Sequence, residues 1–333
     1  MLNISRRNLL LAQGLLGFCT MLAASVPGVA RADFPDRQIR WIVPFPAGGG
    51  LDAVTRIVAG KMSENIGQQI IVENKTGGAG FIGAVALATS KPDGYTLMTQ
   101  ALGMSMNPSI YKGLPYDPIK DIRPVAQIGA VPVVLAIGPN VPATNLKELI
   151  AYAKANPKKM KGGSFALGSG TMLLEMFRLQ AGIELPIVQY RGASDAIAAT
   201  SAGETDIVIM DGTSVFPHIK AGRVKGIVVA ADKRLAELPD VPTTVESGLP
   251  EYKVEFWYTA FVQGQTPKPL VDRLNLEINK AVASAEVTDK LRAIGLATAN
   301  RTADDFTAQH LREMKEWAEI VKKSGFQPLE IAQ

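Results

Sequence analysis

Three consecutive glycines stand between a short apolar segment, residues 39–45, and a helical pattern that begins at Leu51. The first N–H groups of a helix have no partner within it, and the helix dipole favours negative charge at that end. Glycine also lets a ligand approach the backbone closely. Such a loop can hold an anion without a charged side chain, whereas the alternative is a tight turn that needs positive φ. The candidate ligand contacts are Phe45, Ala47, Gly48, Gly49 and Gly50.

A carboxylate follows in the first turn of this predicted helix. Asp52 precedes Arg56 by four residues, a spacing at which two side chains meet on one helix face. Asp52 is therefore a candidate ligand contact. The alternative, of at least equal weight, is that it caps the helix and pairs with Arg56.

A second glycine loop, Gly78-Ala79-Gly80-Phe81-Ile82-Gly83, matches the G-x-G-x-x-G pattern of dinucleotide sites. However, it follows the second predicted strand, and the next strand ends in Thr99-Gln100 without an acid for a ribose. The chain also offers no evident acid or base for hydride transfer. We therefore favour an anion-facing loop with Gly78 and Gly80 as contacts, and we expect no cofactor.

A third loop, Ser169-Gly170-Thr171, lies between a predicted strand and a helix that begins near Met172. Its hydroxyls and free N–H groups would suit a second carboxylate, and ordinary helix capping is the alternative. A nucleophilic serine is a poor interpretation because the pattern is not G-x-S-x-G and neither His218 nor His310 has a patterned partner. We predict no catalytic residue and no enzyme activity.

Two further candidates end predicted strands of the second half. Arg191 and Asp211 would lie at the carboxyl edge of a sheet, where ligands gather in open α/β folds. Arg191 could form a bidentate contact with a carboxylate, and an exposed ion pair is the equally weighted alternative. Histidine and cysteine are nearly absent and the carboxylates are scattered, so we expect no metal site.

Short apolar strands alternate with helical patterns along the chain, which predicts an α/β fold with a mostly parallel sheet flanked by helices. About 300 residues exceed what one core usually serves, so we expect two lobes. The predicted strands span residues 39–45, 69–73, 96–99, 131–137, 164–167, 187–190, 206–210, 226–230 and 255–262. The predicted helices span 51–65, 81–89, 146–155, 172–181, 193–202 and 214–221, and further helices end the chain, one with a Thr302-x-x-Asp305 capping box.

The N-terminus resembles an export signal. Residues 1–32 contain a twin arginine, Arg6-Arg7, an uncharged stretch, and an A-x-A-like cleavage site ending at Ala32. A retained membrane anchor is the alternative, and Phe18 before Cys19 argues against a lipoprotein. We expect a cleaved twin-arginine signal peptide and a periplasmic protein.

The leader holds three arginines and no acid, so the remaining chain has 32 basic and 31 acidic side chains. Its net charge of about +1 gives no basic surface for nucleic acid. Its one cysteine leaves with the leader, which rules out disulfides and thiolate metal sites in the mature chain.

These features together resemble the Bug family of periplasmic solute receptors, the binding components of tripartite tricarboxylate transporters. The resemblance spans nearly the whole mature chain. The matching stretches are I-V-P-F-P-A-G-G-G-L-D-A-V-T-R, V-E-N-K-T-G-G-A-G-F-I-G, K-P-D-G-Y-T-L, N-P-S-I-Y-K-G-L-P-Y-D-P-I-K-D, Y-R-G-A and L-P-D-V-P-T-T-V-E-S-G, with the strand around Trp257.

The resemblance implies a type II Venus-flytrap receptor. Residues 33–130 and 255–333 would form the first lobe and residues 131–254 the second. In this family the loops that match Phe45–Gly50 and Gly78–Gly80 hold one carboxylate, and the loop at Ser169–Thr171 and the strand end at Asp211 reach the ligand from the other lobe. Members often have serines followed by histidine where this chain has Thr171-Met172-Leu173-Leu174, and lysine at Arg191. The apolar Met172 and Leu173 hint at a less polar or aromatic acid.

We therefore predict an exported, monomeric receptor that captures a small organic acid, a carboxylate or dicarboxylate with an aliphatic or aromatic body. It would deliver this acid to membrane transporter subunits. The alternatives are an exported NAD(P)-dependent oxidoreductase and a sensor subunit that presents its ligand to a signalling partner.

Overall fold

The computed structural model describes residues 34–165 and 169–331. The chain divides into Met1–Asp36, of which three residues are described, and one compact unit, Arg37–Gln333. The predicted signal peptide, residues 1–32, lies outside the described residues. Within the described part, every helix is too short or too polar to cross a bilayer.

One half of the central sheet has the strand order β2-β1-β3-β10-β5, with β11 on the far edge of β5. Strands β1, β2, β3 and β5 run in one direction, and β10 and β11 oppose them. Ile42 and Val43 on β1 and Leu97 and Met98 on β3 are fully buried, as expected for strands covered on both faces. The strands are β1 (Ile39–Val43), β2 (Ile70–Asn74), β3 (Thr96–Ala101), β5 (Ile122–Ile137), β10 (Glu255–Gln263) and β11 (Ala297–Thr298).

The other half continues from the same long strand. Residues Val133–Ile137 of β5 pair with β8 on one side, and Val134–Ile137 pair with β9 on the other. Beyond β8 come β6 and β7, and β6, β7, β8 and β9 all run opposite to β5. The strands are β6 (Gly162–Phe165), β7 (Ile187–Tyr190), β8 (Ile207–Asp211) and β9 (Lys225–Val229), and a separate ribbon joins β4 (Tyr111–Lys112) to β12 (Leu329–Glu330).

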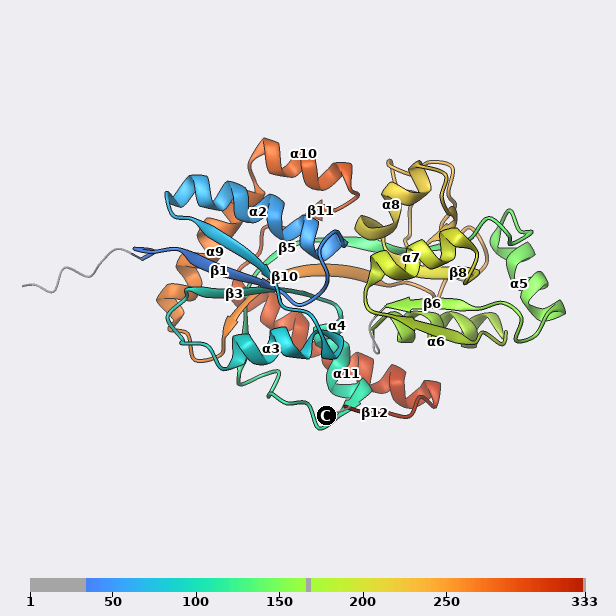
Figure 1. Cartoon of the computed structure of the whole chain (residues 1–333), viewed down its shortest axis with the longest axis horizontal. Coiled ribbons are helices and arrows are strands. Elements are labelled where there is room, and N and C mark those ends of the chain that lie inside the picture. The colour runs from blue at the N-terminus through green and yellow to red at the C-terminus, as the bar shows by residue number, and fades with distance from the viewer. Residues whose placement is uncertain (1–33, 166–168, 332–333) are drawn as a thin grey trace, which may run out of the picture. The chain divides into compact units, whose positions relative to one another are not determined.

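Helices cover both halves (Figure 1). Helices α9 and α10 pack with α2, and α11 packs against α4 and β5. In the second half, α6 and α7 contact β6 and β8. The helices are α2 (Gly50–Ile66), α3 (Phe81–Ala88), α4 (Gly103–Ile110), α5 (Leu146–Ala155), α6 (Thr171–Ala181), α7 (Ala193–Ala202), α8 (Gly212–Lys220), α9 (Lys268–Val282), α10 (Ala285–Ala293) and α11 (Ala303–Ser324), with the 3-10 turn η1 (Gly78–Gly80).

The α/β architecture predicted from the sequence is confirmed, and α5, α7 and β7 have the predicted bounds. The largest difference is β5, which begins at Ile122 rather than at residue 131 and passes through both halves of the sheet. The predicted division at residue 130 therefore falls inside one strand. The assignment of residues to two lobes stays a prediction.

Helix α11 shows how local signals fix an element. The Thr302 hydroxyl accepts a hydrogen bond from the N–H of Asp305 at 3.1 Å and donates one to its carboxylate at 2.7 Å. The helix then buries Phe306 and His310 against Trp257 of β10, with the Trp257 and Phe306 rings 4.9 Å apart. The predicted capping box is confirmed.

His310 is a neutral core residue in this packing. Its Nδ1 lies 2.8 Å from the Ser105 hydroxyl, which donates its proton to Glu313 at 3.0 Å, so Nδ1 carries the ring proton. Nε2 is buried without a partner. Burial lowers the pKa of His310 to about 4.

We expect this histidine to make stability fall in mild acid. The unfolded chain takes up the proton near pH 6.5 and the folded chain only near pH 4, so protonation favours unfolding as the pH drops between these values. This histidine lowers the free energy of unfolding by about 2 kcal/mol between neutral pH and pH 5. Urea unfolding of the wild type and of His310→Asn at pH 7 and pH 5 measures it. An equal fall in both proteins would contradict the assignment.

Candidate functional site

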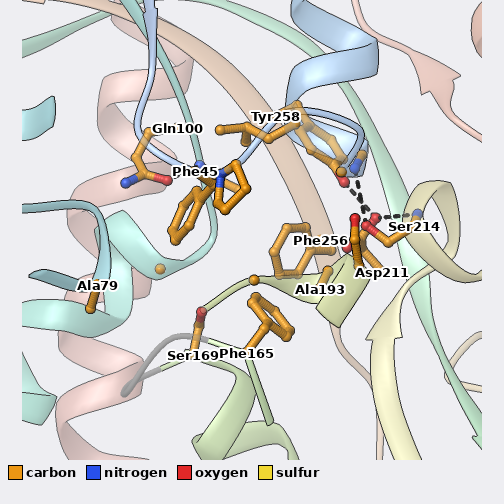
Figure 2. A pocket seen from close by; sticks show the side chains of 18 of the residues that line it. Phe45, Ala79, Gln100, Phe165, Ser169, Ala193, Asp211, Ser214, Phe256 and Tyr258 are labelled. Carbon is orange, nitrogen blue, oxygen red and sulfur yellow. Dashed lines mark hydrogen bonds between the residues drawn. The ribbon is translucent and has the colours of Figure 1, made fainter. Parts of the chain in front are cut away.

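A pocket lies where strand ends of both halves meet the starts of several helices (Figure 2). The first half contributes the loop after β1, the end of β3 and the start of α4. The second half contributes the loops before α6 and α7 and the start of α8, and β10 forms one wall. The lining includes Phe45, Pro46, Gly49, Gly50, Gln100, Phe165, Ser169, Gly192, Ala193, Ser194, Asp195, Asp211, Ser214, Phe256 and Tyr258.

The triple-glycine loop forms part of this wall. Gly49 is the N-cap of α2 and, as a glycine, has no side chain to accept a hydrogen bond from the first turn of the helix. Gly50 is buried and its N–H donates to the Ser214 hydroxyl of the other half at 3.2 Å. A Cβ atom on Gly50 would lie 2.0 Å from the Thr213 hydroxyl. Gly50 is therefore a place of close approach, and Gly48, at φ +83°, is the residue that needs the left-handed turn.

Asp52 supports this loop from behind and does not line the pocket. Its carboxylate accepts hydrogen bonds from the Gly48 N–H at 3.1 Å, from Asn74 at 3.0 Å and from Arg56 at 2.9 Å. Burial opposes its ionisation, but the bonds from Arg56, Asn74 and Gly48 outweigh burial and lower its pKa. The structure thus places Asp52 in the capping and pairing role that the sequence left open. Ala47 and Gly48 are exposed and also lie outside the pocket lining.

The second glycine loop faces an adjoining cavity. Gly78 and Gly80 line this cavity of about 540 Å³ together with Arg191, and Phe45, Ala79 and Asp195 line both spaces. Gly80, at φ +94°, lies under the Phe45 ring, since a Cβ atom there would be 3.2 Å from Phe45 Cζ. The two glycine loops of the first half are therefore neighbours.

The third loop is divided between the pocket and the interior. Ser169 lines the pocket. The Thr171 hydroxyl turns inward, where it lies 3.1 Å from the Ser164 hydroxyl and accepts a hydrogen bond from Gln189 at 2.8 Å. Gly170 is packed against the backbone of Phe165 and does not line the pocket. Met172 and Leu173, which hinted at ligand polarity in the sequence, are fully buried outside the lining.

Helix α7 contributes a contact that the sequence reasoning missed. Gly192 is its N-cap, and no side chain caps this helix. Gly192, Ala193, Ser194 and Asp195 all line the pocket. The glycine directly before a helical pattern was the available signal, whereas the sequence-based prediction assigned the neighbouring Arg191 to the site. That side chain is 87% exposed and pairs with Asp195 at 3.0 Å, at the adjoining cavity.

Asp211 lies on the pocket wall as the N-cap of α8, and it is 3% exposed. Its Oδ1 accepts hydrogen bonds from the Ser214 N–H at 2.9 Å, from the Tyr258 hydroxyl at 2.5 Å and from the Thr213 hydroxyl. Burial and the nearby Asp211 carboxylate raise the pKa of Tyr258 well above its usual value, so this phenol stays a donor.

Aromatic rings form the apolar part of the wall. Phe256 and Tyr258 are two residues apart on β10, so both face the pocket, whereas Trp257 between them faces α11. The Phe256 ring lies 5.7 Å from Tyr258 and 6.4 Å from Phe165 of the second half. The sequence marked β10 as rich in aromatics but could not say which rings reach the site.

The electrostatics of the pocket come from the backbone. Among the described residues, its lining contains two acids, Asp195 and Asp211, and no lysine, arginine or histidine. Helices α2 and α7 begin at the pocket with glycine N-caps, which have no side chain to accept from the first turn, although the Gly50 N–H of α2 donates to the Ser214 hydroxyl. Of the other helices, α5, α8, α10 and α11 are capped by the side chains of Asn145, Asp211, Ser284 and Thr302, whereas α3, α4, α6 and α9 have no side-chain cap. Uncapped helix ends favour an anion.

The described residues offer no candidate metal site. Within residues 34–165 and 169–331, we find no group of three or more histidine, cysteine, aspartate or glutamate side chains placed to hold a metal ion.

Comparison with known proteins supplies the family. A sequence profile described as "Tripartite tricarboxylate transporter family receptor" matches residues 54–326. The chain belongs to this family. The Bordetella pertussis protein BugT is 32% identical over 317 residues, which cover 93% of this chain and 96% of BugT. The resemblance to Bug-type receptors is thereby confirmed.

Solved structures agree with the sequence comparison. An R. palustris protein with adipate is 31% identical with a TM-score of 0.86, covering 89% of this chain and 100% of that one. MatC from Rhodopseudomonas palustris with bound malate is 28% identical with a TM-score of 0.82, covering 86% of this chain and 100% of MatC. The receptor thus has the periplasmic binding protein fold. It is a solute-binding protein and not an enzyme, which sets the oxidoreductase alternative aside.

Proposed function

We propose that this receptor is exported, captures a small organic acid in the pocket of Figure 2, and delivers it to a tripartite tricarboxylate-type membrane transporter. The observation that carries the ligand class is the pair of helix starts with glycine N-caps, α2 and α7, at a pocket whose described lining residues include no lysine, arginine or histidine. The adipate and malate in related structures support a carboxylate.

In this proposal the ligand carboxylate accepts hydrogen bonds from backbone N–H groups near Gly49 and Ala193. Phe45, Gly50, Ser169 and Asp211 complete the contacts from the pocket lining. Gly78, Gly80 and Arg191 would act from the adjoining cavity, and Ala47, Gly48, Asp52, Gly170 and Thr171 would support the loops that carry the contacts. Charge-assisted hydrogen bonds in a desolvated site gain strength, which favours a form closed over the acid.

The mature protein would act as a monomer in the periplasm after removal of residues 1–32. Residues 33–130 and 255–333 would move as one lobe and residues 131–254 as the other, with the ligand favouring the closed arrangement by its differential affinity. A sensor subunit built on the same receptor remains the second candidate, and neighbouring genes for transporter membrane subunits would decide between the two.

The test is a thermal-shift screen of the mature protein against mono-, di- and tricarboxylates, with the matching alcohols and amides as controls. An acid present at 100 times its Kd should add about 2.7 kcal/mol to the free energy of unfolding. For a chain of this size, that is a rise in Tm of several degrees. A set of acids that leaves Tm unchanged would overturn the ligand class.

A further inference from the structure

Asn74 is the last residue of β2, and its side chain is hydrogen-bonded on both flanks of the triple-glycine loop. Its amide nitrogen donates to the Phe45 carbonyl oxygen and to Asp52 Oδ1, both at 3.0 Å. Its amide oxygen accepts a hydrogen bond from Arg56 at 2.8 Å. The amide therefore bridges the residue that begins the loop and the first turn of the helix that follows it.

The chemistry of these partners fixes the direction of the Asn74 amide. A carbonyl oxygen and a carboxylate only accept hydrogen bonds, and a guanidinium only donates them. The amide nitrogen therefore faces the loop and the amide oxygen faces Arg56. Asp52 extends the bridge, because its other oxygen accepts a hydrogen bond from the Gly48 N–H at 3.1 Å. One side chain thus holds the loop at Phe45 directly and at Gly48 through Asp52.

Asn74 also connects this loop to the second glycine loop. The chain continues from it into residues Thr76–Gly80, which line the adjoining cavity. The ring of Phe45, whose carbonyl group Asn74 holds, lies over Gly80 of that second loop and lines both spaces. A change at Asn74 should therefore alter the position of both glycine loops and of the Phe45 ring.

The place of Asn74 in the sheet does not account for these bonds. The pairing of β2 with β1 uses the backbone. Arg56 already has an ion-pair partner in Asp52, at 2.9 Å. Asn74 itself lines neither the pocket nor the adjoining cavity. A loop that is not held in advance must be ordered when the ligand binds, and this ordering costs affinity.

We propose that Asn74 is a positioning residue of the acid site. It does not touch the ligand, and it holds the Phe45–Gly50 loop in the form that presents the start of α2 to a carboxylate. This inference rests on the proposed function, because it takes this loop to hold the acid. Asn74 is half-buried at the end of an edge strand, so its replacement should lower the affinity for the acid and leave the fold in place.

Asn74→Leu removes all three hydrogen bonds at nearly constant volume. Isothermal titration calorimetry at pH 7 measures its effect, with the acid that raises the wild-type Tm most in a screen containing adipate, malate and benzoate. The variant should bind this acid more weakly than the wild type by about tenfold or more. Arg56→Met is the matched control, because it removes the bond to the amide oxygen and leaves both bonds of the nitrogen. It should bind within about threefold of the wild type.

Asn74→Asp separates positioning from a general loss of stability. At pH 7 its carboxylate would face Asp52 and the Phe45 carbonyl without a proton to donate, so affinity should again fall by about tenfold or more. Two carboxylates this close share a proton as the pH falls, and the protonated side chain becomes a donor again. The ratio of its Kd to the wild-type Kd should therefore shrink by about fivefold or more from pH 7 to pH 5. The ratio for Asn74→Leu should stay constant. The charged groups around this position are Arg40, Asp52, Arg56, Glu73 and Lys75.

The outcomes separate this inference from the proposed function. Wild-type affinity at pH 7 in either Asn74 variant overturns the inference and leaves the proposed function standing. A loss in Asn74→Asp that persists at pH 5 does the same. If Asn74→Leu fails to fold, the pH dependence of Asn74→Asp decides alone. If no acid of the screen binds the wild type, the proposed function fails and the inference fails with it.

Discussion

Replacement of Gly49 by aspartate is expected to abolish carboxylate binding while the fold stays intact. Gly49 has φ −81°, and a Cβ atom there would meet only the Pro46 carbonyl oxygen, at 3.8 Å. Aspartate is a preferred N-cap, so its carboxylate would take the N–H groups at the start of α2 and stabilise the helix by about 1 kcal/mol. The ligand would lose these donors and meet a like charge.

We expect an affinity loss of about a thousandfold, or about 4 kcal/mol, because two or more charge-assisted hydrogen bonds disappear. Calorimetric titration measures it, and Tm should stay level or rise. Gly49→Ala fills the same space without an acceptor and should bind within a few-fold of the wild type. Gly49→Asn caps the helix without charge and should fall between the two. Normal binding by Gly49→Asp would show that the glycine loop is only a turn and does not hold the ligand.

Gly50→Ala is expected to weaken binding for a different reason, by holding the two halves of the pocket apart. The added Cβ would lie 2.0 Å from the Thr213 hydroxyl and 2.9 Å from the hydroxyls of Ser214 and Tyr258. These neighbours belong to α8 and β10, so relief of the clash must move the α2 start away from them. Overpacking of this kind costs about 1–3 kcal/mol, or about fivefold to 150-fold in affinity.

A double-mutant cycle with Thr213→Ala isolates this effect. Removal of the Thr213 hydroxyl relieves the shortest contact, so Gly50→Ala should cost clearly less affinity in that background than in the wild type. Gly49→Ala again serves as the control, because it adds a methyl group one residue away in open space. Equal costs of Gly50→Ala in both backgrounds would show that close approach at Gly50 does not govern binding.

Much of the fold follows from local signals in the sequence. Glycine and proline bound the short strands, and the Thr302–Asp305 box sets the start of α11. Helix α4 was missed because Gly103 and Pro108 are poor helix formers, and its packing against α11 stabilises it instead. The first part of β5 was missed because Pro124 interrupts the sequence pattern of a strand. In the structure this part still pairs with β10, with register shifts along the pairing.

Candidate site residues could be predicted only where a single segment of the sequence identifies them by itself. The glycine loops at Gly48–Gly50 and Gly78–Gly80 were found because glycine before a helix has a direct physical meaning. The aromatic wall was not, because Phe165 and Phe256 meet only after distant parts of the chain pack together. The sequence also does not show the direction in which a side chain points. Ser169 lines the pocket, whereas the hydroxyl of nearby Thr171 turns into the interior.

A crystal structure with the tightest-binding acid of the thermal-shift screen will show whether the starts of α2 and α7 hold the carboxylate. The carboxylate oxygens should lie about 2.7–3.1 Å from backbone N–H groups at the starts of both α2 and α7. A carboxylate held instead by lysine or arginine side chains, or an acid bound outside the pocket of Figure 2, would contradict the proposal.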